Sequence, residues 1–289
     1  MARTPVQLDP AKYEQDEDGL PREIVRAWTR EKYLRVRKYV GISGRAVRRN
    51  WRKRGTAGAS YIELFCGPGK VRIEDTNEVT DGSPLVAWLE SKTTDSAFTQ
   101  VHVADADERL VVACQSRLKL AGAPVRSEIG PAIETVDRII KKLNHYALHF
   151  AFLDPYNLRA LPFSIIRKLA TLEHMDILIH VSVQDLNRNL GKYLKQKSSP
   201  LDTFAPGWRV GLDTDRPEQT IRGKVFAHWR SLIKDEGMET AEVAEVVTGT
   251  KRQPLYWLAF AARHKRALEF WEKIRTVGPA SASLFPKSL

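Results

Sequence analysis

The chain has 289 residues, of which 43% are apolar, and this is enough to build one large hydrophobic core. Its two cysteines, Cys66 and Cys114, exclude a disulfide framework, and no apolar leader follows Met1. No run of about 18 apolar residues occurs, so we expect a cytoplasmic protein without a membrane span.

The formal net charge of +11 is concentrated in one segment. Residues 22–54 contain 13 Lys or Arg against two acids, Glu23 and Glu31, so this segment alone has a formal charge of +11. Aromatic residues are interleaved with the basic ones, which is typical of surfaces that bind nucleic acid. An alternative is a solvated helical face that pairs with the acidic stretch at 9–18. The candidate nucleic-acid-binding residues are Arg45, Arg48, Arg49, Arg52, Lys53 and Arg54.

The part of the chain before the first strand is predicted to be helical. Residues 1–20 are acidic and irregular, and apolar residues at helical spacing predict a helix over 22–40. We expect Gly41 to Gly44 to break this helix, followed by a shorter basic helix. The domains are then an acidic tail with a basic helical extension at 1–57 and a larger domain at 58–289.

Strands and helices alternate from residue 58 onward, which predicts crossovers between parallel strands of one sheet. Ser83 is expected to cap a helix, with Pro84 in its first turn. The strands are predicted at 60–65, 99–104, 124–129, 148–153 and 176–183, and helices begin near Ser83, Asp107, Pro131 and Pro162.

The C-terminal part breaks this alternation. After a helix at 218–235, two β-type runs at 241–248 and 255–262 are separated by too few residues for a parallel crossover, so they should pair antiparallel. A last helix covers about 264–275. The chain is therefore predicted to be an α/β protein with a Rossmann-like class I methyltransferase fold, in which a mostly parallel seven-stranded sheet ends in an antiparallel hairpin. Such folds bind S-adenosyl-L-methionine (SAM).

The segment Tyr61–Gly69 resembles the end of a strand that presents its backbone to a ligand. Glycines allow close approach because they have no Cβ, and such turns often require positive φ. The polar stretch Lys70–Gly82 that follows is expected to be a long functional loop. The candidate cofactor-binding residues here are Glu63, Phe65, Gly67, Pro68 and Gly69.

Asp105 ends the second strand, where a carboxylate can accept hydrogen bonds from both ribose hydroxyls. The alternative is that Asp105 caps the following helix, although Asp107 is better placed as the cap. Gly130 ends the third strand and is expected to border an adenine ring; Pro131 is equally well explained as a helix start.

Asp154, Pro155 and Tyr156 follow the fourth strand and are the candidate catalytic residues. Amino-group methyltransferases use a related Asp-Pro-Pro-Tyr motif to orient an exocyclic amine and to stack on its base. Here one proline is present, so Tyr156 stands one residue early. An Asx-type turn is the alternative. His145 and His149 have no third ligand nearby, so no metal site is predicted.

The chain resembles the three-Cys-motif partner family (TcmP), whose members are methyltransferase-like. The resemblance lies in Tyr61–Gly69, Gly82–Leu85, Phe152–Tyr156 and Tyr256–His264, and it spans about residues 30–275. It implies a SAM-binding fold and a partner protein that carries a three-cysteine motif and is similar to radical-SAM proteins.

Three functions remain open at this point. The first is a SAM-dependent methyltransferase that acts on an amino nitrogen of a nucleic-acid base. The second is a methyltransferase-like scaffold that serves its partner without turnover. A nicotinamide enzyme is a third and weaker alternative, because the glycine fingerprint is incomplete.

Overall fold

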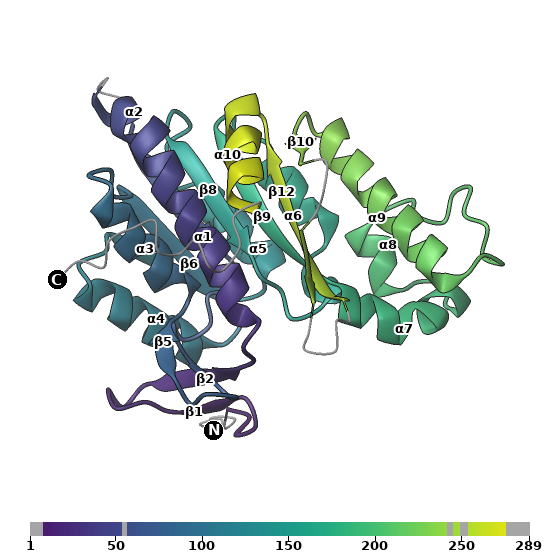
Figure 1. Cartoon of the computed structure of the whole chain (residues 1–289), viewed down its shortest axis with the longest axis horizontal. Helices are drawn as coiled ribbons and strands as arrows, with labels where there is room; N and C mark the ends of the chain where they lie inside the picture. The colour runs from purple at the N-terminus through teal and green to yellow at the C-terminus, as the bar shows by residue number, and fades with distance from the viewer. Residues whose placement is uncertain (1–7, 54–56, 242–244, 249–253, 276–289) are drawn as a thin grey trace.

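The computed structural model describes residues 8–53, 57–241, 245–248 and 254–275 (Figure 1). Its main sheet has the order β10-β12-β9-β8-β3-β6-β7, and β11 also pairs with β12. The strands are β3 (Ala59–Glu63), β6 (Gln100–Asp105), β7 (Val125–Ile129), β8 (Leu148–Leu153), β9 (Met175–Ser182), β10 (Glu239–Thr240), β11 (Glu245–Thr248) and β12 (Pro254–Ala262).

The five strands β7, β6, β3, β8 and β9 are parallel, and β12 runs antiparallel to β9. The short strands β10 and β11 both pair antiparallel with β12, on the edge that β9 does not use. They share one position, so the sheet has seven positions. This order, with an antiparallel strand inserted next to the fifth parallel one, is the class I methyltransferase fold. The predicted fold class is confirmed.

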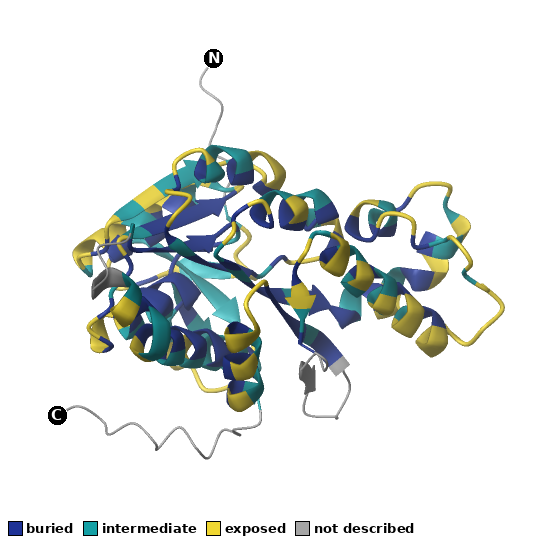
Figure 2. Cartoon of the chain, turned by 90° about the horizontal axis from the view of Figure 1, so that it is seen from above, coloured by how far each residue is buried: buried dark blue, intermediate teal, exposed yellow. Residues whose placement is uncertain are grey.

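Two layers of helices cover the sheet, and the buried residues lie along the strands between them (Figure 2). One core joins the sheet to α1, α3, α4 and α10, and the other joins it to α5, α6, α7, α8 and α9. Among the described residues, no helix is long and apolar enough to cross a membrane. The helices are α1 (Thr29–Ser43), α2 (Arg49–Lys53), α3 (Ser83–Thr93), α4 (Glu108–Leu120), α5 (Ala132–Ile140), α6 (Phe163–Leu169), α7 (Val183–Lys195), α8 (Pro200–Phe204), α9 (Glu218–Asp235) and α10 (Lys265–Arg275), with a π-helix η1 (Gly44–Arg48) and a 3-10 turn η2 (Leu158–Ala160).

A second sheet, of order β1-β2-β4-β5, was not predicted. The residues expected to begin a helix at 22 form β2, which pairs parallel to β4, and the expected loop at 70–82 contains the β4–β5 hairpin. Val71 and Ile73 are buried and alternate with Lys70 and Arg72, which is the period of a strand. Its strands are β1 (Tyr13–Gln15), β2 (Pro21–Val25), β4 (Lys70–Ile73) and β5 (Val79–Asp81). The N-terminal segment is thus built into the rest of the protein.

The helix break expected at Gly41 to Gly44 is also wrong, since α1 continues into η1 without interruption. These glycines serve close packing instead. A Cβ added at Gly41 would lie 2.6 Å from Oε1 of Glu90, and one at Gly44 would lie 2.5 Å from Oγ1 of Thr94. Because Gly41 and Gly44 have no Cβ, this part of the helix can lie directly against α3 and the residues that follow it.

Two helix caps were predicted near strand ends, with different outcomes. Asp107 caps α4 as expected, because its side chain accepts a hydrogen bond from the backbone NH of Arg109 at 3.0 Å. Ser83 is not a cap: Gly82 holds that position and Ser83 is the first residue of α3. This change frees the Ser83 hydroxyl for a contact with Glu63.

Candidate cofactor and substrate site

The carboxyl ends of the parallel strands meet at one edge of the main sheet, and a cavity of about 260 Å3 lies there. The glycine turn after β3, the Asp154 segment after β8 and the start of α1 all line it. Seven of the predicted site residues line the cavity: Phe65, Gly67, Pro68, Gly69, Asp154, Pro155 and Tyr156. Two motifs that lie far apart in the sequence therefore share one cavity, as ligand sites at this edge of such sheets do.

The glycine turn has the backbone conformation that its sequence predicts. Gly67 and Gly69 have φ values of +53° and +82°, and a Cβ at Gly69 would lie 3.2 Å from the Cα of Cys114. The buried guanidinium of Arg117 donates a hydrogen bond to the carbonyl of Pro68 at 2.7 Å. The same nitrogen of Arg117 also donates to the Pro21 carbonyl at 2.8 Å. Arg117 thereby fastens the turn to β2.

Glu63 is the last residue of β3 and does not line the cavity. Its side chain is fully buried, and it accepts hydrogen bonds from the hydroxyls of Tyr61 and Ser83. Burial raises the pKa of Glu63 to about 8, although these two hydrogen bonds act in the opposite direction. A direct contact between Glu63 and a cofactor stays a prediction, while its hydrogen bond from Ser83 joins the end of β3 to the start of α3.

Asp105 and Gly130 extend the same edge of the sheet beyond the cavity. Oδ2 of Asp105 accepts a hydrogen bond from the NH of Gly67 at 3.1 Å, and Oδ1 accepts one from the NH of Asp107 at 3.2 Å. Burial raises the pKa of Asp105, and these backbone donors partly offset that rise. Gly130, with φ +133°, donates its NH to the Asp105 carbonyl at 2.9 Å. Neither residue lines the cavity, so the ribose and adenine contacts stay predictions.

Two residues that the sequence analysis did not identify lie against Asp154. The ammonium of Lys32, from α1, donates to Oδ1 at 2.8 Å and to Oδ2 at 2.7 Å, and Nδ1 of His180, from β9, lies 3.1 Å from Oδ1. The Lys32 nitrogen also lies 5.5 Å from the ring centroid of Tyr256. All of these residues line the cavity.

The charges of this group follow from its surroundings. Burial alone would raise the pKa of Asp154, but Lys32 and His180 lower it below its usual value. Burial, reinforced by Lys32, lowers the pKa of His180 to about 4, so its ring is neutral at neutral pH. The group is therefore an ion pair beside a neutral imidazole. A histidine inside the apolar strand β9 was a signal that sequence reasoning missed, whereas Lys32 is one of many basic residues in its segment.

Tyr156 is 56% exposed and points its hydroxyl to that of Tyr13, at 2.7 Å. This contact links β1 to the segment that follows β8. Glu23, on β2, lines the cavity nearby, and burial raises its pKa to about 7 in spite of the Lys32 charge. Stacking of Tyr156 on a base stays a prediction.

The predicted nucleic-acid-binding residues separate into different environments. Arg48 is buried, and its three guanidinium nitrogens donate to the Ser96 carbonyl, the Ser43 hydroxyl and the Val40 carbonyl. Its assignment to phosphate binding is therefore corrected: Arg48 fastens η1 to α1 and to the segment before β6. Arg45 and Arg49 are exposed. The side chains of Arg52 and Lys53, and all of Arg54, lie outside the described residues.

The predicted absence of a metal site concerns His145 and His149. Among the described residues, no group of three or more His, Cys, Asp or Glu side chains is arranged to hold a metal ion. Burial lowers the pKa of His149 to about 4, so this ring is neutral in the fold.

No protein-family model matches the chain, and no curated protein matches it. Among solved structures, it is similar to protein LPL1258 from Legionella pneumophila (9% identity, 84% of this chain and 92% of that chain, TM-score 0.46). It is also similar to the O-methyltransferase from Bacillus cereus in complex with SAH (11% identity, 82% and 92%, TM-score 0.43) and to cofactor-bound Rv0187 from MTB (14% identity, 79% and 80%, TM-score 0.42). With TM-scores below 0.5, these similarities say nothing about the substrate or activity of this chain.

Proposed function

We propose that the protein is a SAM-dependent methyltransferase. One observation carries this proposal: the Gly67–Gly69 turn and Asp154 line the same cavity. That cavity lies at the carboxyl ends of the parallel strands, in a sheet with the class I methyltransferase strand order. The residues present fit the cofactor, because the turn offers backbone without a Cβ at two positive-φ positions. The adenosyl end would extend toward Asp105 and Gly130, and the sulfonium would supply an activated methyl group.

The acceptor that Asp154 suits best is an amino nitrogen of a nucleic-acid base. A carboxylate oxygen has two lone pairs, so Asp154 can accept a hydrogen bond from an amine while Lys32 keeps its own. This orients the nitrogen toward the methyl group, and transfer then depends mainly on positioning. The neutral ring of His180 lies beside Asp154, with its Nδ1 3.1 Å from Oδ1 of the carboxylate.

The proposed substrate and partner are those that the sequence leads us to expect. The exposed Arg45 and Arg49, together with Arg52, Lys53 and Arg54, would contact phosphate groups of DNA or RNA in the cytoplasm. The resemblance to the TcmP family supports a partner protein with a three-cysteine motif.

A second candidate function is a methyltransferase-like scaffold that binds its partner without turnover. Two contacts favour it: Lys32 is bonded to both oxygens of Asp154, and the Tyr156 hydroxyl is engaged by Tyr13. Both contacts engage side chains that the methyltransferase proposal assigns to the acceptor.

Calorimetric titration with SAM and S-adenosylhomocysteine, with NAD as the control ligand, tests the proposal. We expect binding of the first two, and a loss of about 1–3 kcal/mol of binding free energy in Asp105→Ala, where a ribose edge loses its acceptor. Glu108→Ala, which removes an exposed acid from the same region, should bind like the unaltered protein. Binding without methyl transfer to DNA or RNA, even with the partner present, would favour the scaffold. Absence of binding would reject the methyltransferase.

A further inference from the structure

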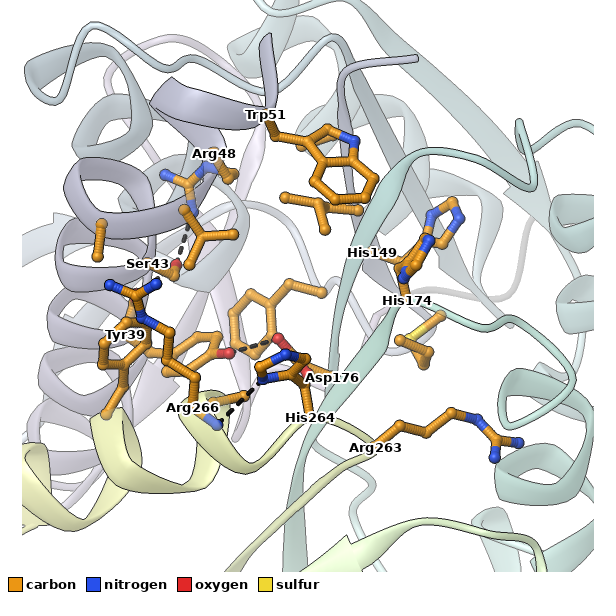
Figure 3. A pocket seen from close by; sticks show the side chains of 18 of the residues that line it. Tyr39, Ser43, Arg48, Trp51, His149, His174, Asp176, Arg263, His264 and Arg266 are labelled. Carbon is orange, nitrogen blue, oxygen red and sulfur yellow. Dashed lines mark hydrogen bonds between the residues drawn. The ribbon is translucent and has the colours of Figure 1, made fainter. Parts of the chain in front are cut away.

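A second and larger cavity, of about 680 Å3, lies at the opposite edge of the main sheet. It opens where β3, β8 and β9 begin, and the C-terminal half of α1, η1, α2 and the start of α10 surround it (Figure 3). Its size is that of a small-molecule site. None of the residues assigned above to the cofactor or the acceptor lines it, so the proposed function leaves it unexplained.

The walls of this second cavity are mainly apolar and rich in aromatic rings. Tyr39 and Phe150 pack with ring centroids 4.7 Å apart, and Trp51 meets the His174 ring edge to face at 5.0 Å. Such walls favour an occupant with an apolar, preferably aromatic, body. Other wall residues are Val47, Phe98, Ala267 and Phe270.

Two carboxyl groups line this cavity: that of Glu173 is exposed, and that of Asp176, at the start of β9, is partly buried. The Oδ2 of Asp176 accepts a hydrogen bond from the Tyr39 hydroxyl (Figure 3), and within the described part of the chain no basic side chain pairs with it. Asp176 is only partly buried and lines the cavity, so an occupant can reach it. Burial raises the pKa of Asp176 to about 7, which is the expected consequence of a carboxylate without a counter-ion.

Three arginines line the cavity, and among the described residues none forms an ion pair with this carboxylate. The guanidinium carbon of Arg266 lies 5.7 Å from the ring centroid of Phe270. The guanidinium of Arg48 is fully engaged by its three hydrogen bonds, and that of Arg263 donates to the carbonyls of Gly237, Glu236 and Ala170. Figure 3 shows Arg263 directed away from Asp176. A cationic occupant would therefore meet the Asp176 carboxylate, which has no basic partner, among aromatic side chains, and aromatic side chains also attract cations.

We propose that this cavity is a second binding site, for an organic cation with an aromatic body whose ammonium group pairs with Asp176. The site is separate from the proposed methyltransferase site, although α1 and β9 contribute lining residues to both cavities. Along α1, Lys32 lines the first cavity and Tyr39 the second; along β9, His180 lines the first and Asp176 the second.

Tryptamine is a suitable probe, and tryptophol, which replaces its amine with a hydroxyl, is the matched neutral compound. Ligand-observed NMR titration of the full chain should show tryptamine binding about tenfold or more tightly than tryptophol, because an ion pair with a desolvated carboxylate exceeds a neutral hydrogen bond. Asp176→Asn, which keeps an acceptor for Tyr39, should remove this preference. Ala267→Leu should weaken both compounds by filling the cavity.

Two controls separate this site from its surroundings. Glu173→Gln, which removes an exposed acid at the edge of the same cavity, should keep the preference for tryptamine. Asp105→Ala, which alters the proposed cofactor site, should also keep it, so failure of the methyltransferase proposal does not decide this one. The proposal is overturned if tryptamine does not bind at about 5 mM, if tryptophol binds equally well, or if Asp176→Asn retains the preference.

Discussion

The Lys32 ammonium bridges both oxygens of Asp154, at 2.8 and 2.7 Å, and so joins the first turn of α1 to the carboxyl end of β8. The two side chains are 12% and 15% exposed, so this ion pair is largely removed from water. Asp154 lies at the position where an acceptor group would be oriented, and its charge state and direction depend on a residue of the N-terminal segment. The basic segment is thus part of the candidate site as well as a surface.

Removal of the Lys32 ammonium should leave the Asp154 carboxylate without a counter-ion. Lys32→Met keeps most of the side-chain volume but leaves Asp154 without its cation, and we expect a loss of about 3 kcal/mol in the free energy of unfolding. Adding Asp154→Asn should recover much of that loss, because the unpaired charge is then gone. Urea unfolding of the four proteins of this double-mutant cycle measures the coupling. Losses that simply add would show that the pair contributes nothing.

Glu63 gives the stability a pH dependence of defined sign. Its pKa is about 8 in the fold against 4.5 in the unfolded chain, so the folded state holds a proton that the unfolded state releases. Its contribution is present in full below about pH 4.5 and is lost as the pH rises through about 8.

Glu63→Gln should therefore lose less stability than the unaltered protein between pH 5 and pH 8. The difference should be at least about 1.4 kcal/mol, the equivalent of one pKa unit. Urea unfolding at several pH values measures it, and Glu108→Gln, at an exposed position on α4, should leave the pH dependence unchanged. Glu23 and Asp176, with pKa values of about 7, contribute slopes of the same sign in all three proteins. If the free energy of unfolding of Glu63→Gln and of the unaltered protein changed equally with pH, Glu63 would not be protonated in the folded state.

The sequence predicted the main sheet well because its strands carry strong local signals. The apolar runs that end at Asp105 and Asp154 coincide with β6 and β8, and the short gap after residue 248 required the antiparallel pair that β11 and β12 form. The second sheet escaped prediction because its strands are short and its central pairing joins β2 to β4 across a distant part of the chain. Ile24 and Trp28 have helical spacing, but pairing with β4 overrides it.

The candidate site divides in the same way. The Gly67–Gly69 turn and Asp154 could be predicted because each motif is a short segment whose residue types indicate its chemistry. Lys32 stands 122 residues from Asp154, and in the sequence nothing distinguishes it from its basic neighbours. Arg48 and Arg45 stand in the same basic stretch of sequence, yet Arg48 is buried and Arg45 is exposed. Such differences depend on packing that a single sequence does not encode locally.

Gly69 should be intolerant of a side chain for two separable reasons. Its φ of +82° strains any other residue by about 1–2 kcal/mol, and a Cβ would also press on the backbone of Cys114, 3.2 Å away. Gly122 has a similar φ of +79° with open space around it, so Gly122→Ala measures the strain alone. Thermal unfolding should show a larger loss of stability for Gly69→Ala than for Gly122→Ala. Equal losses would mean that the turn can move away from α4.

Arg45, Arg49 and Arg48 should respond differently to alanine substitution, although all lie in one basic run. Arg45 and Arg49 are exposed, and the ion pair of Arg49 with Asp95 is long, at 4.0 Å. If they contact phosphates, Arg45→Ala with Arg49→Ala should weaken binding to a short DNA or RNA duplex. The slope of log affinity against log salt concentration should also fall by about 1–2. Stability should change little, since exposed substitutions typically cost less than about 0.5 kcal/mol.

Arg48→Ala should do the reverse. It leaves the buried carbonyl of Ser96 without its donor and removes one of the donors to the Val40 carbonyl, so we expect a loss of about 2–4 kcal/mol in the free energy of unfolding. Under conditions where this variant remains folded, its salt slope should equal that of the unaltered protein, because Arg48 does not reach solvent. Fluorescence anisotropy across a salt series measures both sets of variants. An unchanged slope for the Arg45 and Arg49 pair would remove them from the nucleic-acid interface, and a reduced slope for Arg48→Ala would mean that η1 rearranges when nucleic acid binds.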